Sequence, residues 1–204
     1  MKNNLLSGVV VLSLIVTAGL GCGLADKLKA RSEKGVDVPV RPGDARQTAP
    51  KGVMFESDAM IQDFLSQLKE KLGTDDPNVL DLLVYDQYAM IKVQDPKKPE
   101  NIDGYTYRDG KLSDPAPVKI MGSGKIEDNV FRLSEVNLAA LPKLTEEIRE
   151  KLKDVEGGSI VGYSIDRGLP FKKDVEINPL LNSTRKTITA DADKNGKLIK
   201  FEVK

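Results

Sequence analysis

Apolar side chains recur every three or four residues after Ser57, a spacing that is typical of a helix with one buried face. Ser57 is suited to cap the amino end of this helix, Asp58 favours its first turn, and Gly73 ends it. Short apolar runs separated by turn residues follow and predict strands. The expected strands span residues 79–85, 88–94, 102–108 and 111–120, the last one broken by prolines or at a sheet edge.

A second helix with the same one-sided pattern is expected to begin near Leu141, with Pro142 in its first turn. Its apolar stripe runs to Val155, and Gly157-Gly158 ends it. Strands are expected again at 160–166, 172–177, 185–190 and 197–203, the last two joined by a hairpin at Asn195-Gly196. In both helices we expect the centre of the stripe to be almost fully buried: Phe64 and Leu68 in the first, Leu144 and Ile148 in the second.

The two halves share short sequence matches. Leu-Lys-Glu-Lys-Leu at 68–72 corresponds to Ile-Arg-Glu-Lys-Leu at 148–152, and Asp-Gly-Lys-Leu at 109–112 corresponds to Asn-Gly-Lys-Leu at 195–198. Matches this short also arise by chance, so the duplication is a hypothesis. The pattern predicts an α+β fold of two repeats, 53–133 and 134–204, each a helix packed on an antiparallel meander of about four strands.

This arrangement resembles the small exported PepSY and β-lactamase-inhibitor-like modules, which place a helix against an antiparallel sheet, often in tandem. The resemblance covers roughly residues 53–204 and rests on topology and on the two Gly-Lys-Leu hairpins. It implies an inhibitory or binding module outside the cytoplasm. No motif in the sequence allows a binding residue of these families to be assigned.

Residues 1–21 have the pattern of a secretory signal peptide, with Lys2 before an uncharged, mostly apolar run. The segment 18–22 resembles the lipobox of bacterial lipoproteins, although Gly19 stands where a large aliphatic residue is usual. The resemblance implies cleavage before Cys22 and a diacylglyceryl group on its sulfur, often with an added acyl chain such as palmitate on its amino group. Gly23 favours the periplasmic side of an outer membrane over the inner membrane.

Two other interpretations of the amino end stay open. The uncharged run extends over residues 5–25 and is long enough to span a membrane uncleaved. An ordinary signal cut near Ala18 or Gly21 would instead release a soluble protein with a free thiol. Lipidation is favoured because Cys22 is the only cysteine in the chain and an odd cysteine in an exported protein needs an explanation. Residues 22–52, rich in proline and glycine, are expected to form a tether that carries the lipid at its start.

The composition excludes several function classes. The 204 residues include 31 Lys and Arg against 31 Asp and Glu, so the net charge is zero and a strongly basic nucleic-acid binder is excluded. The chain has no histidine, which excludes histidine triads and histidine metal sites. The carboxylates at 146, 147 and 150 alternate with basic residues and are expected to form a solvated helix face.

The sharpest local motif is a calcium-loop pattern over 191–202, with Asp191, Asp193 and Asn195 at alternate positions and Glu202 at the twelfth. An EF-hand needs helices on both sides, whereas the flanks here alternate like strands. We therefore expect a polar β-turn and no tight calcium site; weak binding outside the EF-hand geometry stays the alternative.

Together these features predict a lipid-anchored protein of the bacterial envelope that binds or inhibits another envelope protein. It is expected to be anchored to the membrane through lipid on Cys22 and to bind no cofactor, metal or nucleic acid. The expected role is not enzymatic. Two alternatives remain: an envelope hydrolase that works through carboxylates, and a carrier for a small apolar ligand.

Overall fold

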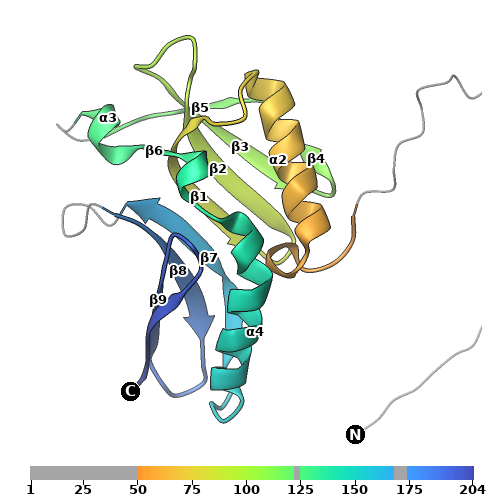
Figure 1. Cartoon of the computed structure of the whole chain (residues 1–204), viewed down its shortest axis with the longest axis vertical. Helices are drawn as coiled ribbons and strands as arrows, with labels where there is room; N and C mark the ends of the chain where they lie inside the picture. The colour runs from red at the N-terminus through yellow and green to blue at the C-terminus, as the bar shows by residue number, and fades with distance from the viewer. Residues whose placement is uncertain (1–49, 122–124, 168–173) are drawn as a thin grey trace, which may run out of the picture. The chain divides into compact units, whose positions relative to one another are not determined.

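The computed structural model of the protein describes residues 50–121, 125–167 and 174–204, which belong to one compact unit spanning Gln47–Lys204 (Figure 1). The predicted signal peptide, Cys22 and all but the end of the predicted tether lie outside the described residues. The unit begins with the short 3-10 turn η1 (Met54–Glu56) and the helix α2 (Asp58–Leu72).

Helix α2 begins and ends where the sequence predicts. Ser57 Oγ accepts a hydrogen bond from the Met60 N–H at 3.3 Å. Gly73 follows the last turn in the left-handed conformation, with φ of 69°, and its N–H donates to the Lys69 carbonyl. Phe64 and Leu68 are each only 1% exposed, so the expected buried stripe is confirmed.

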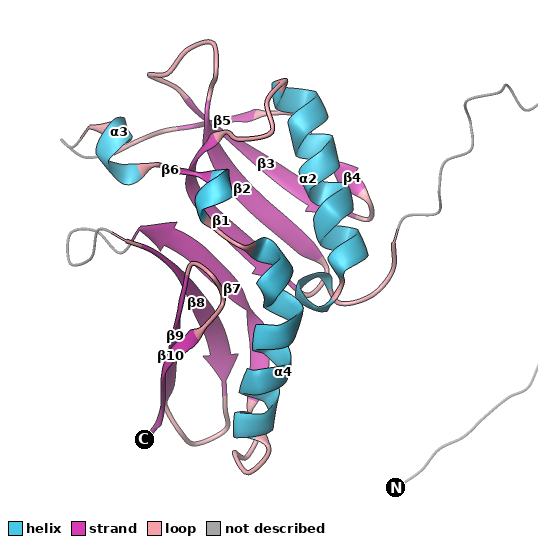
Figure 2. Cartoon of the chain, viewed as in Figure 1, coloured by secondary structure: helices cyan, strands magenta, loops and turns pink. Residues whose placement is uncertain are grey.

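A ten-stranded antiparallel sheet forms the body of the unit, with β1 and β7 paired at its centre (Figure 2). The strand order is β10-β9-β8-β7-β1-β2-β3-β4, while β5 also pairs with β3 and β6 also pairs with β1. The strands are β1 (Asn78–Tyr85), β2 (Tyr88–Gln94), β3 (Ile102–Arg108), β4 (Lys111–Leu112), β5 (Ala116–Val118), β6 (Phe131–Arg132), β7 (Ser159–Arg167), β8 (Val175–Asn182), β9 (Ile188–Asp193) and β10 (Leu198–Val203).

The second long helix, α4 (Leu141–Leu152), lies on the same side of the sheet as α2 (Figures 1 and 2). Leu144 and Ile148 are buried as expected. The helix ends at Leu152, three residues before the predicted Val155, because the chain turns there through Gly157, whose φ of +66° suits glycine. None of the helices in the ranges that the structure describes is long and apolar enough to cross a membrane.

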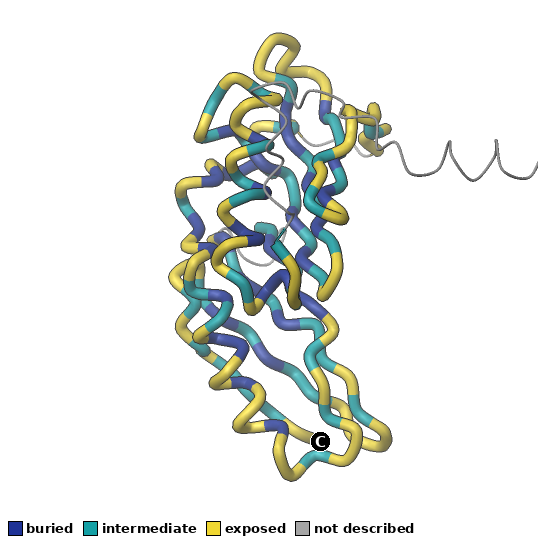
Figure 3. Tube along the Cα trace, turned by 90° about the vertical axis from the view of Figure 1, so that its right-hand side faces the viewer, coloured by how far each residue is buried: buried dark blue, intermediate teal, exposed yellow. Residues whose placement is uncertain are grey.

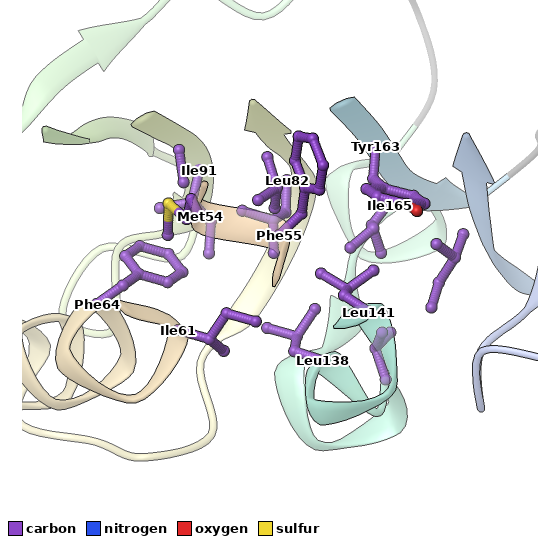
Figure 4. Close-up of a cluster of buried hydrophobic side chains, with 14 of the residues drawn as sticks. Met54, Phe55, Ile61, Phe64, Leu82, Ile91, Leu138, Leu141, Tyr163 and Ile165 are labelled. Atoms are coloured by element: carbon purple, nitrogen blue, oxygen red, sulfur yellow. The ribbon is translucent and has the colours of Figure 1, made fainter. Parts of the chain in front are cut away.

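One apolar core joins the two helices to the sheet. Figure 4 shows Phe55, from η1, between Leu82 on β1 and Tyr163 on β7. The Phe55 and Tyr163 rings meet edge to face, with centroids 5.5 Å apart. Glu56, next in the chain, pairs with Arg149 on α4. The η1 turn therefore ties the first half of the unit to the second. Buried segments run through the interior of the unit while exposed ones lie along its outside (Figure 3).

The segment between the halves contains α3 (Ile126–Asn129), β6, and the 3-10 turns η2 (Leu133–Glu135) and η3 (Leu138–Ala140). The sequence pattern did not predict these elements. Phe131, Leu133, Val136 and Leu138 are buried, and their spacing fits neither a regular helix nor a strand.

The strand expected at 111–120 is broken into two short strands at the sheet edge, β4 and β5, as its prolines predict, because Pro115 and Pro117 supply no N–H donor to a continuous ladder. Some other predicted strand boundaries are wrong. The strand expected at 172–177 is β8, which continues through Pro179 to Asn182. The strand expected at 185–190 begins only at Ile188. In these two strands tertiary pairing overrides the local pattern.

The α+β class with antiparallel strands is confirmed, but the two predicted repeats contribute to one sheet. Each half contains a long helix followed by consecutive antiparallel strands, and the hairpin turns at Gly110 and Gly196 join the third and fourth strands of each run. The predicted boundary at 133/134 falls within η2. The equivalence of the two halves stays a hypothesis.

Candidate binding surfaces

The sheet face opposite α2 and α4, here called the outer face, carries the side chains that alternate with the core residues. On β1 the buried Leu82 and Val84 alternate with half-buried Asp81, Leu83 and Tyr85. Both long helices lie on the other side, so in the described ranges no long helix covers the outer face (Figures 1 and 2). Between them the strands of this face present a broad surface that neither long helix covers.

Four acidic residues from four neighbouring strands form a line across the outer face, here called the acidic row. The strand registers place Asp81 opposite Asp166, Asp166 opposite Glu176, and Glu176 opposite Asp193. Like charges directly opposite one another are destabilising in an antiparallel sheet. The fold thus brings carboxylates from β1, β7, β8 and β9 into one line.

Local donors hold three of these carboxylates in place. Lys92 Nζ donates to Asp81 Oδ2 at 2.8 Å and supplies a positive charge at one end of the row. Ser164 Oγ donates to Asp166 Oδ2 at 2.7 Å. Asp193 Oδ1 accepts two backbone N–H groups of the hairpin that follows it. A hydroxyl or an amide orients a carboxylate without adding a charge of its own.

An aromatic cluster lies toward the other end of β1. The rings of Tyr85 and Tyr88 are stacked, with centroids 4.8 Å apart and planes at 26°. The guanidinium carbon of Arg108 lies 4.4 Å from the centre of the Tyr88 ring. Leu83 and Met90, which face each other across β1 and β2, separate this cluster from the acidic row. Tyrosine and arginine are the residue types that most often anchor protein contacts.

A cavity of about 440 Å³ opens beside Lys92. Ile120 and Met121 on its rim are 42% and 84% exposed, which is high for large apolar side chains. The apolar residues that line it are Leu80, Ile102, Val118, Ile120, Met121 and Ile126.

Two buried tyrosine hydroxyls hold the helices to the sheet. The Tyr107 hydroxyl on β3 donates to Asp63 Oδ2 on α2 at 2.5 Å. The Tyr163 hydroxyl lies 2.7 Å from Thr145 Oγ1 on α4, and either group can donate. Burial is the main reason that the pKa of Tyr107 is raised, and it raises the pKa of Tyr163 to about 12. Each hydroxyl thus forms a hydrogen bond between a helix and the sheet.

The calcium-like segment 191–202 forms a β-hairpin, which confirms the expected polar turn. Lys200 lies opposite Asp191, and Gly196 holds a φ of +78° in a turn packed on Ala140. Across the described ranges, no group of three Asp, Glu or Cys side chains is placed to hold a metal ion. The expected lack of a tight calcium site stays a prediction.

The candidate residues of the sequence fall into three groups. Glu146, Glu147 and Glu150 are exposed on α4, as expected for a solvated face. Cys22 lies outside the described residues, so lipidation stays a prediction. The acidic row was missed, because its members look like ordinary alternation within each strand and only the strand register brings them together.

No protein-family model and no curated protein matches the sequence. Among solved structures, the chain is similar to a protein from Clostridium difficile 630 described as a "putative lipoprotein". The two are 13% identical, the match covers 76% of this chain and 100% of that chain, and the TM-score is 0.46. A likeness at this level shows nothing of the function of this chain.

Proposed function

We propose that the protein is a non-enzymatic binding module of the bacterial envelope, anchored by lipid on Cys22. On this proposal it docks another envelope protein on the outer face of its sheet. The observation that carries the proposal is the outer face itself, where the acidic row and the aromatic cluster share a surface that α2 and α4 leave open. The partner it suits presents basic side chains next to an apolar or planar group.

The protein's own arrangement supports this function in two ways. The acidic row presents carboxylates from four strands side by side, and a cationic partner would be complementary to them. Tyr85 and Tyr88 stack on each other and have few rotatable bonds, so their contact area is already ordered before a partner binds.

Each alternative also has one observation in its favour. Asp81 and Asp166 lie directly opposite on adjacent strands, as a carboxylate hydrolase would require. Asp81, however, is paired with Lys92, and Asp166 is held by Ser164. The apolar cavity beside Lys92 favours a ligand carrier, and we rank this function second.

Lipidation is tested at Cys22. The mature protein is expected to carry an acyl mass increment and to fractionate with membranes, because two or more acyl chains hold a protein stably on a bilayer. Cys22→Ala should lose both properties. Mass spectrometry of the purified mature chain is the direct measurement, and an unmodified Cys22 in that chain would show that the anchor is wrongly assigned.

Docking is tested with a photocrosslinking amino acid placed at Met90 on the outer face, or at Glu147 on the exposed side of α4. We expect a defined crosslinked species in intact cells from position 90 and none from position 147. Asp166→Lys should reduce its yield by about tenfold or more, since the row loses negative charge at its centre. Glu147→Lys is the matched control, because it makes the same charge change on the opposite side of the sheet.

Equal crosslinking from both positions, or a yield insensitive to Asp166→Lys, would count against the outer face as the docking surface. Thermal unfolding of each variant distinguishes loss of binding from loss of folding. Because crosslinking reports on the outer face and mass spectrometry on Cys22, the anchor and the docking surface can fail separately.

A further inference from the structure

We propose that β10 is an open edge at which two copies of this chain pair antiparallel, extending the sheet from one protomer into the other. This inference goes beyond the proposed function and does not depend on it. It rests on three features of β10: its contrast with the opposite edge of the sheet, the direction of its hydrogen-bonding groups, and a sequence that is complementary to itself.

The two edges of the sheet are built differently. At one end, β4 has two residues and β5 has three, and Pro117 lies within β5. Very short strands and prolines are the usual protection of a sheet edge against further pairing. At the other end, β10 has six residues and no proline, and within the described residues it pairs only with β9 (Figure 2). A bulge between Leu198 and Lys200 interrupts its first residues, whereas Lys200–Val203 pair regularly with β9. Ile199 and Val203 on β10 are 62% and 41% exposed.

The backbone groups of alternate β10 residues point away from β9. Lys204 and Thr187 exchange both backbone hydrogen bonds, so they form a hydrogen-bonded pair. In an antiparallel ladder such pairs alternate along the strand, so Glu202 also directs its N–H and C=O toward β9. Phe201 and Val203 must therefore direct theirs to the open edge. These groups are the donors and acceptors that a new strand would use.

The sequence of β10 fits a second copy in one particular register. When Phe201 lies opposite Phe201 of the partner subunit, Lys200 faces Glu202 of the partner subunit, and Glu202 faces Lys200 of the partner subunit. The residues that this register pairs belong to the regular part of β10, since a bulge between Leu198 and Lys200 interrupts the ladder before it. Opposite charges and apolar residues placed directly across two strands both stabilise the pair.

This register also changes the role of the charged residues. Within one copy, Glu202 Oε2 lies 3.5 Å from Lys200 Nζ and 3.3 Å from Lys204 Nζ. Charged side chains normally protect an edge strand from pairing, because burying a charge against an incoming strand is costly and like charges on that strand are repelled. In the proposed register they favour a second copy, since it offers Glu202 against Lys200 and Lys200 against Glu202.

The test is a charge exchange on β10, read by sedimentation velocity of the purified full chain over a range of concentrations. The wild-type chain is expected to form dimers. Lys200→Glu places Glu opposite Glu, and Glu202→Lys places Lys opposite Lys, so each should raise the dimer dissociation constant by about tenfold or more. Mixing these two variants should restore dimers, because both charged pairs between positions 200 and 202 are then Glu with Lys.

A backbone variant provides an independent readout. Val203→Pro removes an N–H that points to the open edge while leaving the hydrogen bonds of Glu202 to β9 intact. We expect it to abolish the dimer with little change in the midpoint of thermal unfolding. The proposal is overturned if the wild-type chain stays monomeric, if mixing the two charge variants fails to restore dimers, or if the Val203→Pro chain still dimerises.

Discussion

Replacing Phe64 with alanine is expected to lower the free energy of unfolding by about 3–5 kcal/mol. Phe64 is 1% exposed at the centre of α2, and its ring meets the Tyr107 ring edge to face with centroids 5.7 Å apart. Truncation removes this contact and leaves a cavity that the helix and the sheet cannot fully close. Because a domain of this size is stable by only about 5–15 kcal/mol, the change should be visible in any equilibrium experiment.

Urea unfolding followed by circular dichroism measures this effect. Leu144→Ala should lower the free energy of unfolding by about 2–5 kcal/mol, since Leu144 lies at the centre of the buried face of α4 as Phe64 does on α2. The control on the same helix is Glu147→Ala, which is exposed and should change the stability by about 0.5 kcal/mol or less. A loss below about 1 kcal/mol for Phe64→Ala would mean that the core under α2 is not packed as described.

Local features of the fold could be predicted from the sequence because local physics determines them. The bounds of α2 follow from a serine cap, a one-sided apolar stripe and a glycine that tolerates a left-handed conformation. The bounds of β2 and β3 were predicted to the residue, since the apolar runs there end at clear turn signals.

Features that depend on contacts between distant residues could not be predicted. The pairing of β1 with β7 makes one sheet out of the two halves, and nothing in the pattern of either strand specifies the other. The acidic row depends on the same pairing. Met54 and Phe55 precede the first predicted helix and look like a short apolar pair, but they fill the centre of the core.

The buried hydroxyl of Tyr163 is expected to make the fold sensitive to alkali. Tyr163 is fully buried, and burial raises its pKa from the ordinary value near 10 to about 12, an effect that the hydrogen bond to Thr145 partly offsets. A phenol is neutral when protonated, so the folded chain holds this proton more tightly than the unfolded chain does. The contribution of this protonated phenol to stability is therefore complete below about pH 10 and is lost as the pH rises toward 12.

A shift of this size corresponds to about 2–3 kcal/mol of stability lost across that interval. Tyr163→Phe should be less stable than the wild-type chain by about 1 kcal/mol at neutral pH, because Thr145 loses its partner in the core. Above about pH 10 the wild-type chain should lose stability faster than the variant, so the difference shrinks and then reverses. Other groups with a raised pKa, such as Tyr107, are present in both chains, so their effect on stability cancels in the comparison. Urea unfolding at a series of alkaline pH values measures the difference directly, and parallel curves for the two chains would show that Tyr163 does not carry the alkaline transition.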